Sequence, residues 1–265
     1  MTPYSNDYQS WLQYQTYDIT EDLERKNHIS VLLGNGWYKS PFGLTASRTG
    51  EPAYSGNWKL IAEIHVLYED GRHETFGTDE NWMVSRSNIL ASGIYDGETE
   101  DATLTEEEPV SAELCTEEMA PLVARYSVPV SVHEELTVKD IIVTPAGETV
   151  IDLGQNMAGT FRLRTHVPRG TRVHLQFGEV LQNGNFYRGN LRLAKAEYIW
   201  VSDGNEHILQ PHFTFYGYRY VKVEGIPDLK KEDFTGLSLY SEIEPRGELT
   251  TGNVLVNQLI SNVKW

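Results

Sequence analysis

Hydrophobic and polar side chains alternate at every second position in several short stretches of this chain, a period typical of β-strands with one buried face. In residues 59–68 one face is apolar, and Glu63 and His65 lie on the other. A Glu-Asp-Gly-Arg sequence at 69–72 then predicts a hairpin turn into a second strand at 73–76. Residues 82–84 offer a third strand. The apolar face consists of Leu60, Ala62, Ile64, Val66 and Tyr68.

The same alternation returns more clearly in the second half. Residues 161–167 and 172–177 read as two strands joined by a Pro-Arg-Gly-Thr turn. The aromatic residues (15 Tyr, 6 Trp and 8 Phe) and the 22 Gly support this interpretation, because aromatic side chains pack well on pleated sheets and glycine suits the turns between strands. We expect four further strands, at 197–201, 207–213, 218–224 and 236–240.

The last residues follow a different period. Val256, Leu259, Ile260 and Val263 recur at helical spacing behind two candidate capping residues, Thr251 and Asn253. This spacing predicts an amphipathic helix. The helix has no obvious packing partner in the chain, which favours a helical neighbour elsewhere in a longer protein.

These patterns predict a mainly β protein: two consecutive β-sandwich (jelly-roll-like) domains with a short C-terminal helix. We place the first domain at residues 1–120 and the second at 121–245. Residues 246–265 form the helical end.

An acidic stretch at residues 95–118 suggests a long surface connection between the two domains. Its acids could instead hold a metal ion, yet their spacing lacks the glycine-centred loop of known calcium motifs, so a solvated linker is favoured. The candidate acids are Asp96, Glu98, Glu100 and Asp101.

The net charge of −16 leaves no surplus of Lys and Arg, which disfavours nucleic acid as a partner. The apolar runs are far shorter than the roughly 20 residues that a bilayer helix needs. No signal peptide follows Met1, so we expect a cytoplasmic chain or one that has lost its true N-terminus. Cys115 is the single cysteine and forms no internal disulfide. Phosphate-binding loops, zinc-ligand spacings and serine-hydrolase elbows are absent from the sequence.

Several longer stretches resemble one enzyme family. "LQYQTYDIT", "NHISVLLGNGWYKS" and "SGIYDGETEDA" are similar to the N-terminal module of bacterial α-L-rhamnosidases (glycoside hydrolase family 78) and occur in the family's order and spacing. The second half resembles the family's concanavalin-like module and its lead into a catalytic barrel, and nearly the whole chain is covered. The matching stretches are "VIDLGQNMAGTFRLR", "GTRVHLQFGEVLQNGNFYRGNLRLAKAEYIW", "QPHFTFYGYRYVKVEG" and "SEIEPRGELTTGNVLVNQLISNVKW".

The resemblance implies a parent enzyme that hydrolyses terminal α-L-rhamnose with inversion, through acidic residues of an (α/α)6 barrel beyond the point that matches Trp265. It also implies that the opening strands of the first module precede Met1. We therefore expect a non-catalytic, accessory fragment with no catalytic residues, whose partners are rhamnose-containing carbohydrate and the catalytic barrel. The alternative is a free-standing carbohydrate-binding protein.

Some members of the family bind rhamnose with calcium in the N-terminal region, which directs attention to the loops of the first module. Asp7 is the candidate metal ligand, and Trp37 or Tyr38 could provide an apolar face for the sugar ring. The alternative is that the Asn and Asp residues form turns and Trp37 fills the core. The predicted carbohydrate-binding residues are Asn6, Asp7, Asn35, Trp37 and Asn57.

A basic group stands out in the second module, where Arg188, Arg192 and Lys195 gather in an acidic chain. This group could face the catalytic barrel. An ordinary exposed loop explains it equally well.

Overall fold

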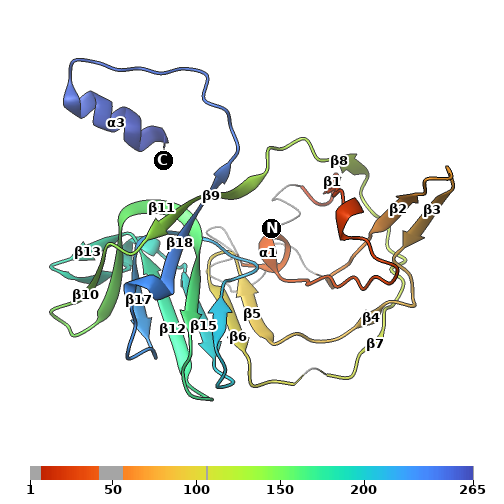
Figure 1. Cartoon of the computed structure of the whole chain (residues 1–265), viewed down its shortest axis with the longest axis horizontal. Coiled ribbons are helices and arrows are strands. Elements are labelled where there is room, and N and C mark those ends of the chain that lie inside the picture. The colour runs from red at the N-terminus through yellow and green to blue at the C-terminus, as the bar shows by residue number, and fades with distance from the viewer. Residues whose placement is uncertain (1–6, 42–55, 106, 265) are drawn as a thin grey trace.

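The structure is a computed structural model that describes residues 7–41, 56–105 and 107–264. Ten strands form one long curled sheet, which Figure 1 shows as the dense body on the left. The strand order is β5-β6-β15-β12-β17-β11-β18-β9, and β10 and β16 also pair with β11. The bounds are β5 (Ile89–Gly93), β6 (Gly97–Asp101), β9 (Val130–Thr137), β10 (Asp140–Val143), β11 (Thr149–Thr165), β12 (Arg172–Gly178), β15 (Glu197–Val201), β16 (His207–Leu209), β17 (Tyr216–Glu224) and β18 (Phe234–Ser241).

The hydrophobic core lies inside this curled sheet and is rich in aromatic rings. Phe161 of β11 is completely buried and stacks on Phe177 and Phe234 at centroid distances of 5.4 and 5.6 Å. The Tyr198 ring meets Phe161 edge-on at 5.2 Å. The period-two pattern of the sequence therefore places one face of β11, β12, β15 and β17 in a shared core.

A bulge bends β11, the longest strand, where its register on β17 shifts between Asp152 and Met157. The Arg219 side chain holds this bend by donating two hydrogen bonds to the Asp152 carboxylate, at 2.7 and 2.9 Å. The Gly154 N–H donates a third, at 2.6 Å. The Arg219 bond holds the pKa of Asp152 below its usual value. The bulge bends β11, so that the same strand pairs with different neighbours in two parts of the curled sheet.

The first half of the chain, up to Ala124, is more open. Apart from β5 and β6, its described strands form three two-stranded ribbons, which lie on the right of Figure 1. Among its described residues, Tyr8 and Ile94 are the only hydrophobic side chains that are buried. A two-stranded ribbon cannot bury both of its faces by itself. The ribbons are β1 (Leu12–Tyr14) with β8 (Leu122–Ala124), β2 (Glu63–Leu67) with β3 (His73–Gly77), and β4 (Met83–Val84) with β7 (Val110–Ser111).

The first half joins the large sheet through β6, which runs parallel to β15. The sequence interpretation of residues 95–118 as a surface connection was therefore wrong for Gly97–Asp101. The sequence did not indicate this strand, because its acidic side chains accept hydrogen bonds from residues far away in the sequence. The Glu98 side chain, for example, is fully buried. Gly97 adopts a φ of +106°, and a Cβ there would lie 1.7 Å from the Glu197 carbonyl oxygen, so the pairing requires glycine.

The predicted C-terminal helix is confirmed as α3 (Val254–Lys264). The Asn253 side-chain oxygen caps it by accepting a 2.9 Å bond from the Leu255 N–H, as the sequence indicated. Figure 1 shows α3 apart from the sheet. Leu255 and Leu259 of this helix are exposed. No helix within the described ranges is long and apolar enough to cross a membrane.

The mainly β class and the short C-terminal helix are confirmed, and the hairpin at 63–77 and the strands at 172–178 and 197–201 form as expected. The division at residue 120 stays a prediction. Strands from both sides of it share one sheet. The remaining elements are short: β13 (Val180–Gln182), β14 (Asn185–Tyr187), α1 (Gly36–Lys39) and the 3-10 turns Thr20–Asp22, Gly189–Leu191 and Lys231–Asp233.

We predict that Phe161→Ala lowers the free energy of unfolding by about 3–5 kcal/mol, because it leaves a cavity between three aromatic rings. Val143→Ala is the control, since Val143 is 73% exposed and its change should cost well under about 1 kcal/mol. Urea unfolding followed by tryptophan fluorescence measures both. Equal losses in the two variants would contradict the assigned core.

Candidate functional site

The loop at residues 34–40 contains two of the predicted sugar-binding residues and the one-turn helix α1. Asn35 anchors this loop to β5, because its N–H donates to the Ser92 hydroxyl at 3.1 Å and its amide Nδ2 donates to the Ser92 carbonyl at 2.8 Å. The Asn35 carbonyl accepts from the Lys39 N–H at 2.8 Å. The Asn35 side chain is therefore part of the scaffold of the loop.

A tryptophan that the sequence analysis did not select lies beside this loop. The Trp58 indole N–H donates to the Gly34 carbonyl at 3.2 Å, and the Lys39 ammonium lies 4.0 Å from the ring centroid. Trp58 is an exposed side chain, at 50%, whereas Trp37 is only partly exposed. Its neighbour Asn57, which was predicted, is exposed.

Asp7 begins a tight turn. Its carboxylate accepts from the Ser10 hydroxyl at 2.5 Å and from the Gln9 N–H at 3.2 Å, and the Ser10 bond holds the pKa of Asp7 below its usual value. The next residue, Tyr8, meets the Tyr38 ring edge-on at 5.6 Å. The turn is therefore close to the 34–40 loop, as a shared site requires.

A calcium ion takes six to eight oxygen ligands. The described residues contain no group of three or more His, Cys, Asp or Glu side chains that could hold a metal, and both carboxylate oxygens of Asp7 already accept local bonds. Asp7 by itself does not form such a site, and calcium stays a prediction. Asn6 lies outside the described residues.

The 34–40 loop packs on a turn of the second half at residues 211–214. A Cβ at Gly34 would lie 2.5 Å from the Phe213 ring, so any larger residue there would force the ring or the loop to move. At the other end of the loop, the buried Ser40 hydroxyl accepts from the Ile94 N–H at 3.1 Å. The Thr214 hydroxyl donates to the Ile94 carbonyl at 3.2 Å. The candidate site is thus built on contacts between both halves.

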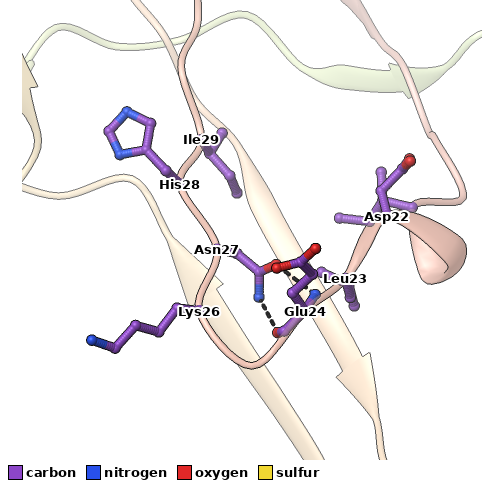
Figure 2. Close-up of a pocket in the computed structure, with 8 residues that line it drawn as sticks. Asp22, Leu23, Glu24, Lys26, Asn27, His28 and Ile29 are labelled. Atoms are coloured by element: carbon purple, nitrogen blue, oxygen red, sulfur yellow. Dashed lines mark hydrogen bonds between the residues drawn. The ribbon is translucent and has the colours of Figure 1, made fainter.

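A shallow depression elsewhere in the first half, shown in Figure 2, contains none of the predicted residues. At its base the Asn27 side chain forms two bonds with the backbone of Glu24, at 2.7 and 2.8 Å. These bonds close a local turn. The depression is lined by Ile19, Asp22, Leu23, Glu24, Lys26, Asn27, His28 and Ile29.

The basic group of the second half does not form one exposed patch. Lys195 lies 3.4 Å from the Asp96 carboxylate. Arg188 is half-buried beside Glu197, and its burial lowers the pKa of the guanidinium. Arg192 is exposed at a positive φ of 57°. Lys195 and Arg188 therefore each have an acidic partner nearby.

Comparison with known families agrees with this architecture. A model of the alpha-L-rhamnosidase N-terminal domain matches residues 1–144, and a model of the bacterial alpha-L-rhamnosidase concanavalin-like domain matches residues 142–240. These matches define the chain as a pair of β modules of the glycoside hydrolase class. The chain belongs to the α-L-rhamnosidase family.

Individual relatives are much longer than this chain. An alpha-L-rhamnosidase of Streptomyces avermitilis is 31% identical over 280 residues, which is 100% of the chain and 27% of the relative. The structure of the Streptomyces avermitilis enzyme complexed with L-rhamnose has a TM-score of 0.85 at 30% identity, and 27% of it is covered. The native enzyme of Aspergillus terreus has a TM-score of 0.86 at 27% identity, with 32% covered. In both structures the similarity covers 100% of this chain.

We predict that Asn35→Ala lowers the melting temperature, because the loss of its amide bond to Ser92 costs about 1 kcal/mol. Asn57→Ala removes an exposed amide and serves as the matched control, with an expected change near zero. Differential scanning calorimetry measures both. A reversed order of the two variants would contradict the anchoring role of Asn35.

Proposed function

We propose that this chain supplies the non-catalytic β modules of an α-L-rhamnosidase-like glycoside hydrolase, whose parent cleaves terminal α-L-rhamnose with inversion. The observation that carries the proposal is the match of two successive rhamnosidase β-module families along the chain. The chain also spans only 27–30% of the length of the curated rhamnosidases that it matches. The cytoplasmic location stays a prediction.

The environment of the buried acids supports a non-catalytic role. An inverting glycosidase needs two carboxyl groups about 6.5–9.5 Å apart that both face the sugar and a water molecule. In this chain the buried carboxylate of Glu98 is enclosed by backbone donors, and that of Asp152 is paired with Arg219. Both carboxylates are therefore occupied by partners within the fold, which supports a structural role for them.

The exposed apolar face of α3 supports a contact with the rest of the parent enzyme. Leu255, Leu259 and Val263 are 80%, 60% and 78% exposed. An amphipathic helix with such a face is stabilised when it packs against other helices. We propose that the catalytic barrel is this partner.

We predict that the purified chain releases no nitrophenol from an aryl α-L-rhamnoside at any pH, because the paired-carboxylate mechanism is missing. Absorbance over several hours measures release, and a full-length rhamnosidase is the positive control. Turnover that persists through repurification and scales with protein concentration would contradict the proposal.

We also propose that the 34–40 loop and the Asn57-Trp58 edge bind L-rhamnose weakly. Three features support this: the half-exposed indole of Trp58, the polar groups of the Asp7 turn, and the L-rhamnose complex of the Streptomyces avermitilis relative. An indole face with polar groups at its rim is suited to the apolar face and hydroxyls of a sugar ring.

We predict a dissociation constant in the range of about micromolar to millimolar, since a monosaccharide has few atoms with which to gain binding energy. Trp58→Ala should abolish the heat of binding in calorimetry while the chain still unfolds cooperatively, and a loss of binding on chelation would show that binding depends on a divalent cation such as calcium. Val84→Ala is an exposed control from another ribbon. Unaltered binding by Trp58→Ala would exclude this edge, and no heat with the wild-type chain would exclude the site.

A further inference from the structure

One buried carboxylate joins the two halves of the chain next to the candidate site. The Glu98 side chain on β6 is 0% exposed. It accepts hydrogen bonds from the backbone N–H groups of His212 and Phe213 at 3.0 and 3.1 Å. The His212 ring nitrogen Nδ1 lies 3.0 Å from the other carboxylate oxygen. A buried charge requires such partners, so Glu98 fixes the shape of the 211–214 turn.

The imidazole of His212 is the titratable member of this pair. Its side chain is 49% exposed, which gives it access to solvent protons. The bond to Glu98 is the main cause that raises the pKa of His212, and Glu100 adds a smaller effect of the same sign. Glu100 itself accepts from the Tyr198 hydroxyl at 2.9 Å and from the Asn88 amide at 2.8 Å. The charged groups that act on His212 are thus two acids of β6.

The same turn contacts the 34–40 loop directly at Gly34 and is linked to Ser40 through Ile94. The Phe213 ring packs under Gly34, and the Thr214 hydroxyl donates to the carbonyl of Ile94, whose N–H donates to Ser40. A shift of the 211–214 turn would therefore reach the loop through direct contacts.

We propose that Glu98 and His212 are positioning residues for the 34–40 loop, and that protonation of His212 tightens the packing of this loop on the 211–214 turn. The protonated ring donates a charge-assisted hydrogen bond to a carboxylate that solvent does not reach. The neutral ring carries no charge, so its interaction with the Glu98 carboxylate is weaker. The role of the loop in sugar binding rests on the function proposed above, whereas the packing itself does not.

The direction in which pH changes the stabilisation by His212 follows from proton linkage. A histidine whose pKa is higher in the folded state contributes its stabilisation fully below the unfolded pKa of about 6.5. This contribution is lost as the pH rises through the raised pKa of the folded state. The loop should therefore be held more firmly at pH 6 than at pH 8.

Amide hydrogen exchange of the sugar-free chain tests this, with protection factors corrected for the intrinsic effect of pH. We expect the protection of Asn35, Lys39 and Ile94 to fall between pH 6 and pH 8 by about two- to fivefold, the factor for a half-exposed ion pair. His212→Gln keeps a donor for Glu98 but cannot titrate, so its protection should not change with pH. His207→Gln is the matched control, because His207 pairs with Asp203 in the second half and should leave the pH effect intact.

Glu98→Gln provides a second arm and should lower the pKa of His212, measured by NMR titration of its ring protons. Protection that does not vary with pH in the wild-type chain, or that varies equally in His212→Gln, would overturn the inference. An unchanged titration of His212 in Glu98→Gln would overturn it as well. A pH-dependent loop in a chain that gives no heat with L-rhamnose would support this inference and contradict the proposed sugar site.

Discussion

The parallel pairing of β6 with β15 is the interaction on which the rest of this structure depends. It is the edge at which the open first half becomes part of the large sheet. Backbone bonds cross this edge from Ala102 to Val201, from Glu197 to Asp96 and from Ala196 to Tyr95. Gly97 makes the approach possible, because any side chain there would overlap the facing backbone. The described residues of the first half include few buried hydrophobic side chains, so this pairing is a main attachment of the first half to the core.

The candidate site follows from the same constraint. The 34–40 loop is held by Ser92 of β5 and by the turn that Glu98 of β6 closes. Residues distant in the sequence thus meet where the two halves join. Family membership of both halves is consistent with a combined unit, since the two matched models adjoin near residue 142. Strands from both halves share one sheet, which agrees with the proposal that these modules support a catalytic barrel in a longer parent enzyme.

Some of this structure was predictable from the sequence, because local patterns determine it. Strands such as β15 alternate clearly between faces, and the cap of α3 needs only Asn253 and a hydrophobic period. The strand β6 was not predictable in this way. Its Glu98 looks like a solvated acid until His212, 114 residues later, is brought beside it. The exposed Trp58 was missed for a similar reason, since exposure depends on tertiary packing. Asp7 proved to form local bonds within a turn, whereas Asn35 bonds to Ser92, 57 residues later, which no local motif indicates.

Native-state hydrogen exchange in low concentrations of urea tests the shared sheet most directly. We expect the amides of Ala102, Ala196 and Glu197, which bridge the two halves, to exchange only in the same cooperative unfolding event as the core strand β12. The amides of the β2–β3 ribbon serve as the reference for local opening. If the bridging amides instead exchange at the low free energy of that ribbon while β12 stays protected, the two halves are separate units, which would contradict a shared sheet that unfolds as one.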